Sequence, residues 1–158
     1  MNRRLRVVVF IILIALVIFS TTFILANSFM DYERSHGSSG VITGIITSTE
    51  DEEEWKQIDL IVRKIAHVIE YAFLGACVSA LCVFIDRVYH KLFYGYFIAY
   101  SLFVAVLDEH IQSFSDRASS TSDILLDFLG SVIGFIGVVI LCCALRYLIK
   151  RKKERKIK

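Results

Sequence analysis

The stretch RKIAHVIEYAFLGACVSALCVF, residues 63–84, begins with charged and polar side chains and continues as an apolar segment long enough to cross a bilayer. At helical spacing, Arg63, His67 and Glu70 fall on one face, so a cation, an imidazole and a carboxylate line one side of an apolar helix. An ionisable group at membrane depth costs on the order of 2.5–3.5 kcal/mol. This face must therefore meet polar partners elsewhere in the chain.

The composition is that of a membrane protein. Of the 158 residues, 56% are hydrophobic, and the mean hydropathy is +0.61, whereas a soluble domain usually lies near about 45–50% apolar. The net charge is only +2, and no nucleic-acid partner is expected. The cysteines lie in apolar blocks without Cys-x-x-Cys spacing, so we interpret them as packing residues.

Four apolar blocks predict the fold. A helix needs about 20 residues to cross roughly 30 Å of hydrocarbon, and each block reaches that length, the third only if Asp108–Phe114 belongs to it. We therefore predict an all-α membrane protein with four transmembrane helices, in a single membrane domain over residues 1–158. The predicted spans are residues 7–26, 61–84, 92–114 and 124–149.

Lysine and arginine predict the orientation, because short loops rich in these residues stay in the cytoplasm. Basic residues precede the first span, lie between the second and third spans, and fill the tail at 150–158, whereas the 27–60 segment is acidic. Both termini are therefore expected in the cytoplasm, with 27–60 as an outer loop. Arg63 and Lys64, at the outer end of the second span, run against this rule, which indicates a local partner for them.

The outer segment is expected to contain both a loop and a helix. Ser35–Ser48 is rich in Ser, Gly and Thr and is typical of a loop. Thr49-Glu50-Asp51-Glu52 fits a capping box, and Trp55, Ile58 and Val62 follow at helical spacing. We expect an amphipathic helical segment at the outer surface before the second span, with Trp55 at the membrane interface.

Ionisable groups of three spans are predicted to lie at one level. Counting 1.5 Å per residue from the cytoplasmic ends, the polar positions of the second, third and fourth spans lie about 21–33 Å up, in the outer part of the membrane. The residues counted are His67, Glu70, Asp108, Glu109, Asp123 and Asp127. On the fourth span, Gly130 and Gly134 follow near the face of Asp127, so this helix is expected to pack closely through 130–134 with its carboxylates pointing into the bundle.

Three motifs in order resemble the VanZ-like family of small bacterial membrane proteins. The first is Arg-Lys-x-x-His-x-x-Glu-Tyr-x-x-Leu-Gly at Arg63–Gly75, and the second is Asp-Glu-x-x-Gln-x-Phe at Asp108–Phe114. Arg117, Asp123 and Gly130 complete the pattern. The chain departs from it at Ser115-Asp116, where the family often has Pro-Gly, and at Asp127, where it often has Asn.

The resemblance implies a multi-pass protein of the bacterial cell membrane and cell envelope. The founding member of the family is linked to resistance to teicoplanin-type glycopeptide antibiotics. Most members have no assigned reaction. The resemblance therefore implies a location in the cell membrane but no particular reaction.

The residue types of the polar layer allow several kinds of chemistry. Imidazole and carboxylates can exchange protons or bind cations, which makes a catalytic set of His67, Glu70, Asp108 and Glu109 conceivable. Because Asp108 and Glu109 are adjacent, we expect one to face the bundle and the other the outer surface. Each of these groups can alternatively have a structural role, as a hydrogen-bonding or ion-pairing partner within the bundle.

A second set of residues suits binding. Arg63 and Arg117 can hold a phosphate or carboxylate, and Gln112, Asp123 and Asp127 complete the candidate binding residues. Oxygen and imidazole ligands can hold a divalent cation, with Glu70, Glu109, Asp123 and His67 as plausible ligands, but no compact ligand motif is present and the cofactor stays open.

Three classes of function are compatible with these observations. The chain is an enzyme that acts on an envelope lipid or peptidoglycan precursor at the outer leaflet, a non-catalytic module that binds such a component or an antibiotic, or a structural or regulatory subunit whose polar residues lock the helix bundle. Beyond the lipid bilayer, the expected partner is such a lipid-linked component; the oligomeric state stays open.

Overall fold

The computed structural model describes residues 2–29, 41, 43–45, 51–90, 94–114 and 120–155. Within this part the chain is helical and contains no strand, which confirms the all-α prediction. The long helices are α1 (Arg3–Ser28), α3 (Glu52–Tyr89), α4 (Tyr94–Gln112) and α5 (Thr121–Arg155).

Three of the long helices are long and apolar enough to cross a membrane: Arg3–Ser28, Glu52–Tyr89 and Thr121–Lys152. These helices contain the first, second and fourth predicted spans. The third predicted span corresponds to α4, which has 19 residues and is not among them. The structure therefore supports a membrane protein with three candidate spans, and a fourth crossing by α4 stays a prediction.

The predicted outer loop is shorter than expected, because helices extend into both of its ends. Helix α1 continues to Ser28, and α3 begins at Glu52 with Asp51 as its N-cap. The Asp51 carboxylate accepts hydrogen bonds from the backbone N–H groups of Glu53, at 2.9 Å, and Glu54, at 3.4 Å. The N-cap is thus Asp51 and not Thr49, which lies outside the described residues.

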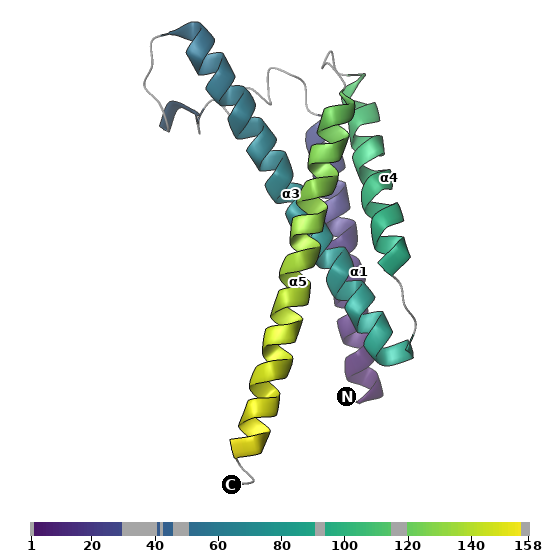
Figure 1. Ribbon diagram of the computed structural model, residues 1–158. Coiled ribbons are helices and arrows are strands. Elements are labelled where there is room, and N and C mark those ends of the chain that lie inside the picture. Colours follow the sequence, from purple (N-terminus) through teal and green to yellow (C-terminus); the bar gives the residue numbers. More distant parts are fainter. Residues whose placement is uncertain are drawn as a thin grey trace.

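Helix α3 is one uninterrupted helix of 38 residues. At 1.5 Å per residue it is about 57 Å long, nearly twice the thickness of the hydrocarbon layer. The predicted amphipathic segment is therefore the first part of α3 and not a separate surface helix. Figure 1 shows this end of α3 leaning away from the other helices. The helix ends at His90, whose φ of 53° lies in the left-handed region.

The four helices form a bundle in which α3 contacts all the others. Helix α5 crosses α3 in the most extensive helix–helix contact (Figure 1). Helices α1 and α4 contact each other and α3, and α4 also contacts α5. The N- and C-terminal ends lie at the same end of the bundle (Figure 1). The polar residues singled out above lie toward the opposite end.

Apolar residues fill the centre of the bundle and also cover its outside. Ile24, Leu74 and Val104 are almost fully buried, whereas large apolar side chains on every long helix are exposed. In water such a surface would be a large aggregation liability, but it suits a lipid environment. The surface therefore agrees with the membrane character that helix length and composition indicate.

Glycines allow the close crossing of α3 and α5. A Cβ at Gly134 would lie 1.9 Å from the backbone oxygen of Ala72, and a Cβ at Gly75 would lie 2.1 Å from that of Ser131. Gly130 is similarly confined against Val68. The obstructing atoms are backbone atoms, so no side-chain rotation relieves the clash. The predicted close packing of the fourth span through 130–134 is confirmed.

We expect Gly134→Ala to destabilise the protein by about 1–3 kcal/mol, because the added methyl group forces α5 away from α3. Gly137→Ala is the matched control, since a Cβ at Gly137 meets nothing within 4 Å. The control should be neutral or slightly stabilising, because alanine favours helix by up to about 1 kcal/mol over glycine. The measurement is thermal unfolding of the purified protein in detergent, followed by circular dichroism. Equal midpoints for both variants would contradict the close crossing.

Candidate functional site

Polar side chains from all four helices meet near the end of the bundle opposite the termini. We call this set the polar layer. It contains buried carboxylates and their partners, while apolar residues surround it on the outside of the helices. Its members in the described residues are Asn27, Ser28, His67, Glu70, Tyr71, Asp108, Glu109, Gln112 and Asp127.

Asp108 is the centre of this layer and is fully buried. Its Oδ1 accepts a hydrogen bond from Ser28 Oγ of α1. Its Oδ2 accepts from the Tyr71 hydroxyl of α3 at 3.0 Å and from Gln112 Nε2 of α4 at 3.2 Å. Donors from three helices thus converge on one carboxylate, which fixes its orientation. Gln112, predicted as a binding residue, contacts Asp108 directly.

Glu109 is also buried, with 5% of its surface exposed. Its Oε1 accepts a hydrogen bond from the backbone N–H of Ser120, next to the start of α5. The prediction that either Asp108 or Glu109 faces the outer surface is therefore wrong. The two adjacent side chains do diverge, as the helix requires, but each finds buried partners in a different direction.

An ion pair lies close to Glu109, between the N-terminal parts of α3 and α5. Lys64 Nζ lies 2.8 Å from Asp123 Oδ1, and both side chains are partly exposed. This pair confirms that Lys64 has a local partner, as its unfavourable position in the charge pattern indicated. A partly exposed pair contributes little to stability, and with Lys64 bound to it Asp123 serves as an ion-pairing residue. Arg63 is half-buried one turn before His67.

Glu70 faces α1, away from the centre of the layer. Its Oε1 accepts a hydrogen bond from Asn27 Nδ2 at 3.0 Å. Its Oε2 is buried and has no hydrogen-bond partner among the residues that the structure describes. Glu70 also lines a groove of about 360 Å³ whose other walls are mainly apolar side chains of α1 and α3, among them Phe19, Phe23 and Phe73. The result is one carboxylate oxygen, without a hydrogen bond, beside an apolar groove.

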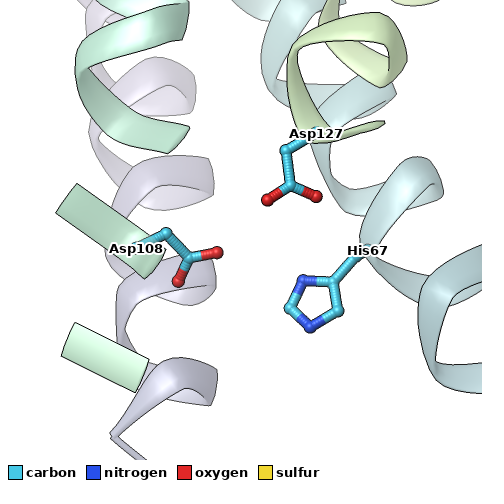
Figure 2. A group of neighbouring side chains, drawn as sticks. All are labelled: His67, Asp108 and Asp127. Atoms are coloured by element: carbon cyan, nitrogen blue, oxygen red, sulfur yellow. The ribbon is translucent and has the colours of Figure 1, made fainter. Parts of the chain in front are cut away.

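His67, Asp108 and Asp127 point into one space from α3, α4 and α5 (Figure 2). One potential ligand atom from each lies within 4.8 Å of the others. These are the described His, Cys, Asp and Glu residues that come close enough to share a metal ion. Of the predicted metal ligands, only His67 belongs to this group; Glu70, Glu109 and Asp123 do not.

Several residues of the layer were not predicted as site residues. Asn27 and Ser28 lie at the very end of α1, where their polarity looked like the start of a loop. Tyr71 belongs to the first motif, but its hydroxyl had no assigned role. A signal was present in each case, namely a polar atom beside an apolar block, but its partners lie on other helices. Arg117, predicted to bind an anion, lies outside the described residues.

Comparisons with known proteins agree with the motifs. The model of the VanZ/LLP1 family matches residues 7–143, which is most of the chain. No curated protein and no solved structure matches the chain. The matched range contains the four long helices from the first turns of α1 through most of α5, and with them the whole polar layer. The chain therefore belongs to the VanZ/LLP1 family.

Proposed function

We propose that this chain is a multi-pass protein of the bacterial cell membrane that binds a lipid-linked component of the cell envelope at its polar layer. The component has an apolar chain and a polar headgroup, as lipid-linked peptidoglycan precursors do. In this proposal the chain crosses the membrane four times, α4 included, with both termini in the cytoplasm and the polar layer in the outer leaflet.

The groove beside Glu70 carries the proposal. Its walls are apolar and belong to the outward faces of α1 and α3, with Phe19 62% and Phe73 49% exposed, so an acyl or prenyl chain can enter from the lipid phase. Glu70 stands in the same groove. An apolar site with one fixed polar group suits an amphipathic ligand, because the polar group fixes the orientation while the apolar walls supply affinity.

The second oxygen of Glu70 indicates what the headgroup supplies. A buried acceptor without a hydrogen bond costs about 1–3 kcal/mol, and Oε2 of Glu70 is such an acceptor. A hydroxyl, amide or ammonium donor of a bound headgroup would satisfy it. Sugars and peptides carry these donors, which favours a glycosylated or peptide-bearing lipid over a simple hydrocarbon.

The geometry favours binding over catalysis. Asp108 is held by three donors and Glu109 by a backbone N–H. Groups tied in this way serve better as fixed acceptors than as proton carriers, because a proton on either carboxylate would displace a hydrogen bond. For this reason we propose a binding role for His67, Glu70, Asp108 and Glu109 and not the catalytic role considered from sequence.

A structural role is the second candidate, and the hydrogen bonds to Asp108 favour it. They join α1, α3 and α4, as polar residues that lock a membrane bundle would. Each such contact contributes about 0.6 kcal/mol on average. This role accounts for Asp108 but not for the buried, unbonded oxygen of Glu70.

The family relationship extends the proposal to the cell. We propose that binding of an envelope precursor contributes to protection against teicoplanin-type glycopeptides, which act on the outer surface where the polar layer would lie. Binding would shield or withdraw the precursor that the antibiotic recognises.

The proposed topology predicts the activity of fused reporters. A reporter that is active only outside the cytoplasm should be active when fused at Ser39 and silent when fused at Tyr89. The reason is that basic residues keep the connection between the second and third predicted spans in the cytoplasm. Activity of cell-surface reporters in intact cells measures this directly. The reverse pattern would refute the outer-leaflet position of the polar layer.

The proposed lipid site predicts that Glu70→Gln weakens binding of a lipid-linked peptidoglycan precursor by about tenfold, since one acceptor oxygen is replaced by an NH₂ group. The amide oxygen still accepts from Asn27, so the fold should be kept. Glu53→Gln is the matched control, an exposed carboxylate of the same helix. Native mass spectrometry of the protein in nanodiscs measures the bound fraction. Equal binding by both variants would exclude Glu70 as a headgroup acceptor.

The binding model also predicts how protection in cells depends on single residues. Glu109→Gln and His67→Gln should lower teicoplanin protection only partially. In the binding proposal each variant loses a contact that maintains the shape of the binding site, and neither loses a group that takes part in a reaction. The minimal inhibitory concentration, with membrane levels of each variant as the control, measures this. Complete loss of protection by both variants at unchanged membrane levels would favour an enzyme instead.

A further inference from the structure

His67, Asp108 and Asp127 form a cluster whose geometry approaches that of a metal site. Their potential ligand atoms lie within 4.8 Å of one another. Around an ion with ligand distances of about 2.0–2.2 Å, neighbouring ligand atoms lie about 3–4 Å apart. A closure of about 1 Å by side-chain rotation brings the three atoms to that distance. Figure 2 shows the imidazole and both carboxylates directed toward the common space.

Asp127 is buried among other ionisable groups. Only 3% of its surface is exposed, and a carboxylate oxygen lies within 4.8 Å of potential ligand atoms of His67 and Asp108. Asp108, Glu109 and Glu70 lie near enough to repel a negative charge on Asp127. A carboxylate buried among other carboxylates needs a compensating positive charge. Its position beside Asp108 and His67 marks the point where a cation would supply that charge.

Asp108 is oriented in the way that metal-bound carboxylates are. Ser28, Tyr71 and Gln112 donate to its two oxygens. Hydrogen bonds to a ligand fix its rotamer and contribute to metal affinity. The three donors thus orient the Asp108 carboxylate, as hydrogen-bond donors around a metal site orient its carboxylate ligands.

We propose that His67, Asp108 and Asp127 bind one divalent transition-metal ion of the Zn²⁺ or Mn²⁺ kind. The imidazole nitrogen selects such an ion over Mg²⁺ or Ca²⁺, which prefer sites made only of oxygen ligands. Three protein ligands leave at least one coordination position open, so a water molecule or an anionic group of a ligand completes the shell. The metal joins α3, α4 and α5 and neutralises part of the negative charge in the polar layer.

The site is tested by titrating the purified protein with Zn²⁺ and with Mn²⁺ after treatment with a chelator. Calorimetry in detergent gives the affinity and stoichiometry, and the thermal midpoint gives the effect on stability. The wild type should bind one ion and unfold at a higher temperature with it, because a ligand of the folded state stabilises that state. Asp127→Asn should weaken binding at least about tenfold.

The control is Asp59→Asn, which removes the charge of a fully buried aspartate on α3 outside the cluster. It should bind the metal like the wild type. If Asp127→Asn unfolds, His67→Gln provides the same comparison. Absence of stoichiometric binding by the wild type, equal binding by the cluster variants and the control, or Ca²⁺ binding as tight as that of Zn²⁺ and Mn²⁺ would each overturn the proposal.

The metal site shares His67 and Asp108 with the proposed binding residues, but it can be tested without the lipid function. It rests on His67, Asp108 and Asp127, whereas the lipid site rests on Glu70 and the groove between α1 and α3. The titration contains no envelope lipid. A failed titration therefore removes the metal site alone, and failed precursor binding leaves the titration result unchanged.

Discussion

The buried carboxylate of Asp108 constrains the arrangement of the bundle. It is inaccessible to solvent, so every hydrogen bond it receives must come from the protein, and its donors belong to α1, α3 and α4. A shift of any one of these helices along its axis would remove a donor from this buried carboxylate, at a cost of about 1–3 kcal/mol. Apolar packing alone tolerates such shifts in lipid, because one apolar face resembles another. Helix α5 is positioned differently, by glycine contacts with the α3 backbone.

Much of the fold was predictable because its signals are local. The length and apolarity of the blocks around Val7–Ala26 and Ile124–Ile149 identify α1 and α5 without knowledge of their neighbours. Gly130 and Gly134 share a helix face, so their close packing was also visible. The continuity of α3 was not, because the change from polar to apolar composition near Leu60 looked like a change of direction. A helix can pass from water into lipid without a break. Composition shows the change of environment but not whether the helix continues through it.

The candidate site was predictable only in outline. The spacing of His67 and Glu70 showed that they lie near one face of a helix, and depth counting brought Asp108 and Asp127 to the same level. Partners could not be assigned, since Ser28, Tyr71 and Asn27 acquire their roles only when α1, α3 and α4 pack together. Depth fixes one coordinate of a residue, whereas hydrogen bonding depends on the rotation of each helix about its axis. This is why one of Asp108 and Glu109 was expected at the outer surface, whereas both are in fact buried.

The length of α3 gives the crossing at Gly75 the role of a pivot. From that point to Glu52 the helix extends about 35 Å, and to His67 about 12 Å. A rotation of about 10° about the crossing would move the outer end by about 6 Å but His67 by only about 2 Å. A large movement of the N-terminal end of α3 would thus become a small displacement of the His67 imidazole. That displacement is comparable to the length of one metal–ligand bond.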